Sequence, residues 1–315
     1  MIGVSMGMTS EEPITHLEWF DGLLEEARIA NPQEHIRVMT LPGSYLDRFA
    51  EARGARRVPI QLDGASGTPG RMSAPATRVF LLPAALRLLA GSARAPRGAA
   101  LLEPVLRLIH GLAGVEGALD PASRRQRVRT DPFIRLGAIV AARARAGKNQ
   151  VALVAAPDWR GFEPWLEQLV EESLGKGGKG FCLFYGEQAW NTLATDPLVI
   201  GLGAGAEGEI ALRLPAAESA VERLALAGAL CLGFERTIAT YGYLEDIVFA
   251  GQPGVEAYKT YARSYRDAPG EIRFDESTAD SARFGRWTFH AGALTRKKLI
   301  ASEQLGAEAR RLGGD

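Results

Sequence analysis

Short apolar runs alternate with longer runs of helical periodicity along most of this chain, and that alternation restricts the fold more than any other feature. Ile2–Ser5, Ile36–Thr40 and Gln150–Ala156 have the length and the aliphatic content of buried strands, and each precedes a segment with apolar residues at helical spacing. Strands that are separated by helices pair in parallel, because the connecting helix crosses over the sheet. The sequence therefore predicts an α/β protein with parallel or mostly parallel sheets flanked by helices.

The same criteria place the remaining elements and suggest three regions. Gly64–Pro75 is rich in Gly, Ser and Pro and is predicted to be a loop. The predicted domains are 1–120 and 121–265, followed by 266–315 as either an arm that packs on a partner subunit or a partly mobile tail. Further strands are predicted at Arg56–Leu62, Gly180–Gly186, Asp196–Gly203 and Glu209–Pro215, and helices at Ile14–Ala30, Tyr45–Arg53, Val79–Gly91, Phe133–Ala146, from Trp165 and from Ala217.

Composition excludes several classes of protein. Lys plus Arg and Asp plus Glu both number 37, so the net charge is zero and no cationic excess favours nucleic acid or a membrane surface. The sequence contains no uninterrupted apolar stretch of membrane-spanning length and no secretory signal pattern. Cys182 and Cys231 lie in apolar runs, and the four histidines lack ligands at metal-binding spacing. We expect a cytoplasmic protein without a metal or an organic cofactor.

Two motifs have less specific interpretations. Gly203, Gly205 and Gly208 spell GxGxxG, but the segment that follows has the pattern of a strand instead of the helix that a dinucleotide loop requires. We therefore interpret this glycine motif as a hairpin-like or surface turn. The arginine-rich run Ser123–Thr130 is predicted to be a solvated face, with a phosphate-binding patch as the alternative.

The helix that starts at Trp165 carries acidic residues in its last turn, where the helix dipole disfavours them. A helical wheel places Gln168 and Glu172 together along one edge of the apolar stripe, whereas Glu167 and Glu171 point away. Partial shielding and the dipole would both raise the proton affinity of Glu172, as a general base requires. The alternative is that these acids are all solvated surface groups.

Four segments in the same order resemble the phosphoglucose isomerase family. "EQLVEESLGKGGKG" resembles the family segment QLxxESxGK, and "GQPGVEAYKTYAR" resembles its signature DQPGVEAYKK. "LPGSYLDRFAEARG" and "PGRMSAPATRVFLLPAAL" are similar to its DPGSPLEKLA and GGRYSVLTPVGLLPAAL. The resemblance implies two sugar-isomerase units, each a five-stranded parallel sheet with flanking helices, usually assembled as a dimer.

The resemblance also implies a chemistry, the interconversion of glucose 6-phosphate and fructose 6-phosphate through a cis-enediol. Glu172 matches the base that moves a proton between C1 and C2, and Arg71 matches the arginine that stabilises the enediolate. Lys259 matches the lysine linked to ring opening, and Gln168 and Gln252 match glutamines that line the pocket. Neither a metal nor an organic cofactor takes part in this reaction.

The amino-terminal segment departs from the family pattern. "VSMGMTSEEP" resembles the family's phosphate loop SKSGTTIEP, with hydroxyls kept at Ser5, Thr9 and Ser10 and with Met6 in place of the lysine. The family's leading strand and glycine-rich turn do not precede this segment, so the first unit is expected to be incomplete. The hypotheses are a phosphosugar isomerase, an impaired descendant that binds sugar phosphate or acts as a scaffold, and half of a split isomerase. A homodimer or a complementing N-terminal subunit is the expected assembly.

Overall fold

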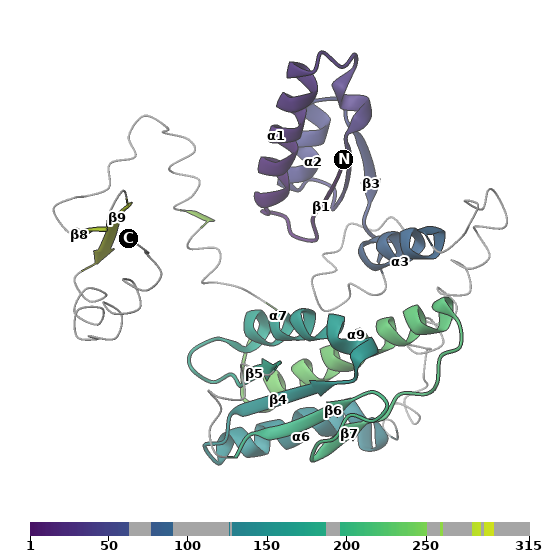
Figure 1. Cartoon of the computed structure of the whole chain (residues 1–315), viewed down its shortest axis with the longest axis vertical. Coiled ribbons are helices and arrows are strands. Elements are labelled where there is room, and N and C mark those ends of the chain that lie inside the picture. The colour runs from purple at the N-terminus through teal and green to yellow at the C-terminus, as the bar shows by residue number, and fades with distance from the viewer. Residues whose placement is uncertain are drawn as a thin grey trace. The chain divides into compact units, whose positions relative to one another are not determined.

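The computed structural model of the chain describes residues 1–62, 77–90, 126, 128–186, 196–250 and 259–260, together with the backbone of 279–284 and 287–292. The chain divides into two compact units, Met1–Gln252 and Pro253–Asp315. The first unit contains two separate parallel sheets, and helices pack against both (Figure 1). The predicted division at residue 120 falls outside the described residues and stays a prediction.

The first sheet has three parallel strands in the order β1-β2-β3, with bounds Ile2–Val4, Arg37–Thr40 and Arg56–Pro59. Its buried face contacts α1 (Glu12–Glu26) and α2 (Tyr45–Ala52) through a cluster of aliphatic and aromatic side chains. Leu17 of α1 is fully buried against Gly3 of β1, which gives the helix a close contact with the edge strand. Ser44 begins α2 because its hydroxyl accepts a hydrogen bond from the Asp47 amide at 3.1 Å.

Helix α3 (Arg78–Ala90) follows the first sheet and joins it to the other part of the unit. Its side chains Val79 and Leu82 pack beside Met39, Leu41 and Ile60 at the carboxyl ends of β2 and β3. A second set of α3 side chains, Leu81 and Ala84, packs against the start of the long helix α9 (Ala220–Leu244).

The second sheet has four parallel strands in the order β5-β4-β6-β7, with bounds Cys182–Tyr185, Gln150–Ala155, Leu198–Leu202 and Ile210–Leu212. Helices α6 (Pro132–Arg145), α7 (Glu163–Leu174) and α9 share one apolar core with this sheet. Val151, Leu183 and Ile200 point toward all three helices from neighbouring strands. The strand order changes direction at β4, the position beside which α/β sheets bind ligands.

The connection between β6 and β7 corrects the predicted hairpin-like turn. The two strands pair in parallel, with Ile200 opposite Ile210 and Leu202 opposite Leu212, although only residues 203–209 join them. This segment returns across the sheet in direct contact with β6, because a Cβ on Gly208 would lie 2.6 Å from the Gly201 amide nitrogen. The GxGxxG glycines therefore permit a tight parallel return, and no helix follows them in the manner of a dinucleotide loop.

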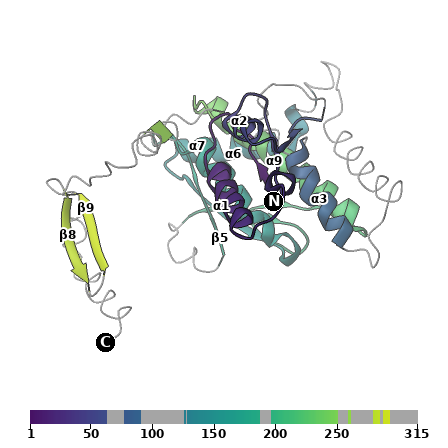
Figure 2. The ribbon, with the colours of Figure 1, turned by 90° about the horizontal axis from the view of Figure 1, so that it is seen from above.

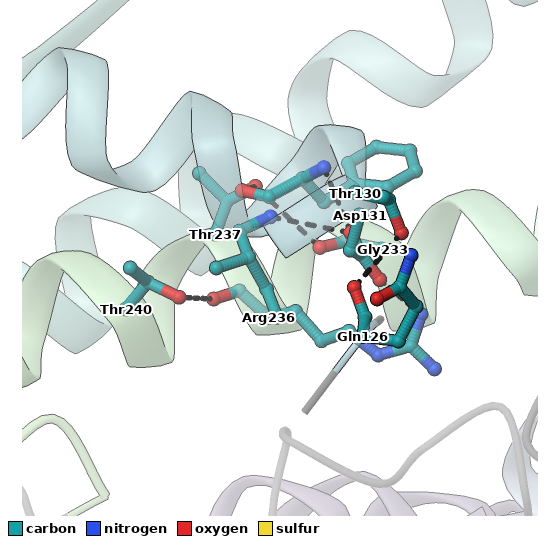
Figure 3. Close-up of polar contacts among 9 residues, drawn as sticks. Gln126, Thr130, Asp131, Gly233, Arg236, Thr237 and Thr240 are labelled. Carbon is teal, nitrogen blue, oxygen red and sulfur yellow. Dashed lines mark hydrogen bonds and ion pairs between the residues drawn. The ribbon is translucent and has the colours of Figure 1, made fainter. Parts of the chain in front are cut away.

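Helices α6 and α9 meet in a close crossing that polar groups fix in place (Figure 3). Asp131 caps α6 by accepting hydrogen bonds from the amides of Phe133 and Ile134, and its second oxygen lies 3.5 Å from the Arg236 guanidinium. The Thr237 hydroxyl donates to the Phe133 carbonyl at 2.9 Å. Asp131 is 6% exposed, so its carboxylate acts as a buried link between the start of one helix and the middle of the other.

The second unit contains an antiparallel pair, β8 (Ala279–Phe284) and β9 (Trp287–Gly292), which the sequence pattern did not indicate (Figure 2). Gln126 and Arg129, which lie in the arginine-rich run, are helical and exposed, as expected of a solvated face. Within the described part of the chain, the helices are too short or too polar to cross a membrane.

Candidate active site

The carboxyl end of α7 presents the predicted base and its glutamine neighbour together. The Gln168 amide nitrogen donates a hydrogen bond to a Glu172 carboxylate oxygen at 2.8 Å, across one turn of the helix. This contact confirms that the two side chains share a face and gives Glu172 a fixed neighbour. The glutamine also keeps its own amide oxygen as an acceptor beside the carboxylate.

The predicted shielding of Glu172 is wrong, and so is the prediction that Glu167 points away from the covered face. Gln168 and Glu172 are both exposed, whereas Glu167 is half-buried and accepts a hydrogen bond from the Tyr185 hydroxyl at 3.2 Å. Burial and the adjacent Glu167 carboxylate raise the pKa of Tyr185, so this phenol stays protonated and keeps donating. The edge of α7 that faces the sheet therefore carries Glu167, and the edge with Glu172 faces outward.

The lysine-containing loop after α7 is tied to the segment that follows α9. The Lys176 ammonium donates to the carbonyls of Val248 and Phe249 at 2.8 and 3.2 Å, and the Lys179 ammonium lies 3.3 Å from the Glu245 carbonyl. The Tyr241 hydroxyl donates to the Lys179 carbonyl at 2.8 Å, which closes the same junction from the α9 side. These bonds place residues 245–249 beside the end of α7 that bears Glu172.

The predicted phosphate loop occupies the carboxyl end of β1 and leads into α1. Ser5 is buried, and its hydroxyl exchanges hydrogen bonds with the backbone of Gly7, donating to the carbonyl and accepting from the amide. Thr9 and Ser10 are half-buried in the same loop. The Met8 carbonyl accepts from the Tyr45 amide at 2.9 Å, which ties this loop to the start of α2.

Acidic groups stand where a phosphate would meet the start of α1. Glu11 is the N-cap residue and makes no side-chain capping bond, while a Glu12 carboxylate oxygen accepts from the Glu11 amide at 3.1 Å. A carboxylate at this position competes with any other anion for the positive end of the helix dipole. The loop thus keeps the hydroxyl side chains that match the family's phosphate loop, and the acidic residues add negative charge beside them.

Sequence reasoning missed two hydroxyls at this edge of the first sheet. Thr40 and Ser44 are buried and their hydroxyl oxygens lie 2.9 Å apart, directly after β2 and at the start of α2. The available signal was the sequence Thr-Leu-Pro-Gly-Ser at 40–44, because a strand that ends in Thr and a helix that begins at Ser bring both side chains to the carboxyl edge.

The remaining predicted site residues are Arg71, Gln252 and Lys259. Arg71 and Gln252 lie outside the described residues. Lys259 is half-buried in a helical turn of the second unit, and the two units are described separately. The structure therefore brings together Gln168 with Glu172, and Ser5 with Thr9 and Ser10 in one loop. Within the described ranges, no cluster of His, Cys, Asp or Glu has the makeup of a metal site.

Comparison with known proteins shows what the chain is similar to. It is 26% identical over 311 residues to glucose-6-phosphate isomerase of Rippkaea orientalis (strain PCC 8801 / RF-1), an alignment that covers 80% of this chain and 54% of that protein. It is 27% identical over 280 residues to glucose-6-phosphate isomerase of Cyanothece sp. (strain PCC 7425 / ATCC 29141), covering 74% and 49%. These similarities support a phosphoglucose isomerase-like origin of the chain.

Solved structures agree with the fold of the chain. A glucose-6-phosphate isomerase from Chlamydia trachomatis matches with a TM-score of 0.57 and 18% identity over 86% of this chain and 60% of that one. A hypothetical protein from Thermus thermophilus matches with a TM-score of 0.53 and 20% identity over 85% and 71%. No family profile matches the chain, and it spans about half the length of the curated relatives.

Proposed function

We propose that this chain is a phosphosugar aldose–ketose isomerase that moves a proton between C1 and C2 of its substrate through a cis-enediol. The observation that carries the proposal is the hydrogen bond at 2.8 Å from Gln168 to Glu172, at the carboxyl end of α7, in a chain with this ancestry. Glu172 acts as the base, and Gln168 holds the carboxylate in one orientation by donating to one of its two oxygens.

We assign Gln252 to the same pocket, as the family resemblance implies. We assign Lys259 to ring opening and Arg71 to stabilisation of the enediolate, as the family resemblance implies.

The proposed reaction requires a drier environment for Glu172 than its exposed position on α7 provides. We propose that assembly supplies this environment, either through a second copy of the chain or through a complementing N-terminal subunit. The substrate is then a phosphosugar bound between the end of α7 and the hydroxyl loop of Ser5, Thr9 and Ser10.

A proton-exchange experiment tests the reaction. The purified chain is incubated in heavy water with glucose 6-phosphate and with fructose 6-phosphate, and NMR follows deuterium at C2 of the aldose and at C1 of the ketose. We expect exchange that falls at least about 100-fold in Glu172→Gln, the usual effect of removing a general base. Glu171→Gln is the matched control, since Glu171 is the adjacent exposed acid of the same helix end and has no assigned role. Equal exchange in both variants would contradict the role of Glu172.

A second candidate function is that of an impaired descendant that binds a sugar phosphate without catalysis, because the acidic start of α1 weakens the phosphate contact that catalysis needs. Glu12 accepts from the Glu11 amide where a phosphate would need donors, and Met6 carries no charge. This candidate predicts no C2 exchange but measurable binding of glucose 6-phosphate by calorimetry. Binding that weakens in Ser5→Ala, with no exchange in the unmodified chain, supports this function over the isomerase. Glu12→Gln should then tighten the binding, because it removes a competing carboxylate.

A further inference from the structure

The carboxyl edge of the second sheet holds a hollow that the proposed isomerase site does not use. Its volume is about 610 Å³, within the range of small-molecule pockets. It lies where β4 and β6 end, beside the position at which the strand order reverses, and residues before and within the first turns of α9 form another wall. The residues that characterise its lining are Trp159, Phe162, Leu214, Leu224, Arg87 and Arg223.

The floor of the hollow is held by hydrogen bonds between strand ends. The Ala156 amide donates to the Leu202 carbonyl at 2.8 Å, and the Gly203 amide donates to the Leu212 carbonyl at 3.0 Å. Trp159 packs directly on Gly203, since a Cβ at that glycine would lie 2.8 Å from the indole ring. The half-buried indole is thereby fixed by one neighbour while it lines the hollow.

The charge of the hollow comes from arginine side chains. Arg87 and Arg223 supply two cations against the single carboxylate of Asp158, and no ion pair within the described ranges engages either guanidinium. The start of α9 adds little attraction for a bound anion, because the amides of Glu218 and Ser219 already donate to the Glu222 carboxylate. The attraction for an anion therefore rests on the arginines, whose planar guanidinium groups suit phosphate.

We propose that this hollow is a second ligand site, for a phosphate monoester carried on a ring. The ring stacks on Trp159 among the apolar side chains, and the phosphate pairs with Arg223 and Arg87. The site is separate from Glu172, because α7 runs from the edge of the hollow at Phe162 to the turn with Glu172. Ten residues of helix correspond to about 15 Å.

Ligand-observed NMR and calorimetry test the proposal with three probes: AMP, glucose 6-phosphate and inorganic phosphate. We expect one of the two ring phosphates to bind and inorganic phosphate to bind at least about tenfold more weakly. Arg223→Gln should weaken the binding by about tenfold or more, and Ala217→Phe, which fills the hollow, should abolish it. Arg129→Gln, at an exposed arginine outside the hollow, should have no effect.

The outcomes separate this site from the proposed isomerase site. Binding at the hollow should persist in Glu172→Gln, and C2 exchange, where present, should persist in Arg223→Gln. The proposal is overturned if all three probes fail to bind at roughly 10 mM. It is also overturned if Arg223→Gln and Ala217→Phe both bind as the unmodified chain does, or if inorganic phosphate binds as tightly as the ring phosphates. Loss of binding in Glu172→Gln alone assigns the ligand to the isomerase site and likewise overturns it.

Discussion

Gly137 of α6 should tolerate no side chain, because α6 and α9 cross there in backbone contact. A Cβ at this position would lie 2.6 Å from the Thr237 carbonyl oxygen and 2.9 Å from the Thr240 Cβ. Ordinary van der Waals contact begins at 3.4 Å, so Gly137→Ala forces the two helices apart by roughly 0.8 Å. A gap of that size removes about a quarter to a half of the dispersion energy at each separated contact.

The net effect combines two opposing contributions. Alanine in a helix interior gains about 0.5–1 kcal/mol over glycine, whereas overpacking costs about 1–3 kcal/mol. We therefore expect Gly137→Ala to lower the free energy of unfolding by about 1–2 kcal/mol. The melting temperature should fall by about 2–8 °C, since a unit of this size shifts by about 2–4 °C for each kcal/mol.

Gly22 of α1 is the matched control, because it also lies inside a helix but no heavy atom beyond the adjacent backbone of that helix comes within 4 Å of the position that a Cβ would take there. Gly22→Ala should stabilise by about 0.5–1 kcal/mol. Circular dichroism of the helical signal, followed through urea and thermal unfolding, measures both variants. If Gly137→Ala is as stable as the unmodified chain or more stable, the close crossing of α6 and α9 is wrong.

Two further predictions concern the thiols and a buried phenol. Burial raises the pKa of Cys231 to about 12, so at about pH 8 Ellman's reagent should modify the exposed Cys182, whereas Cys231 should react only in denaturant. Equal rates of modification of the two thiols in the folded protein would contradict this prediction. Burial likewise raises the pKa of Tyr241 to about 12 from an unfolded value of 10.0, so the folded state binds this proton more tightly. The contribution of Tyr241 to the free energy of unfolding is complete below pH 10.0 and declines as the pH rises toward about 12. Tyr241→Phe should therefore reduce the slope with which the free energy of unfolding falls over that pH range. An unchanged slope would refute the assignment.

The sequence pattern was sufficient to predict most helices and strands of the first unit. Strand β4 at Gln150–Ala155 and helix α6 at Pro132–Arg145 lie within one residue of the predicted ends, because aliphatic periodicity and capping residues determine them locally. The pairing of β6 with β7 was not predictable in this way. Periodicity locates a strand but does not determine which strand pairs with it. The connection at 203–209 depends on contact between Gly201 and Gly208.

The candidate site was predictable to a smaller extent. The helical spacing of Gln168 and Glu172 was enough to predict that their side chains meet. It was not enough to predict which edge of α7 is covered, since that depends on Tyr185 in β5, whose hydroxyl reaches Glu167. The hollow beside Trp159 had no sequence signal, because its walls come from segments that are distant along the chain.

The two lysines after α7 have a consequence for the segment that follows α9. Lys176 and Lys179 donate hydrogen bonds to backbone carbonyls of residues 245–249, a few positions before the second unit begins at Pro253. Substitution of either lysine would therefore be felt at both ends of the core, in the turn after α7 and in the segment after α9, although the two are more than sixty residues apart in the sequence.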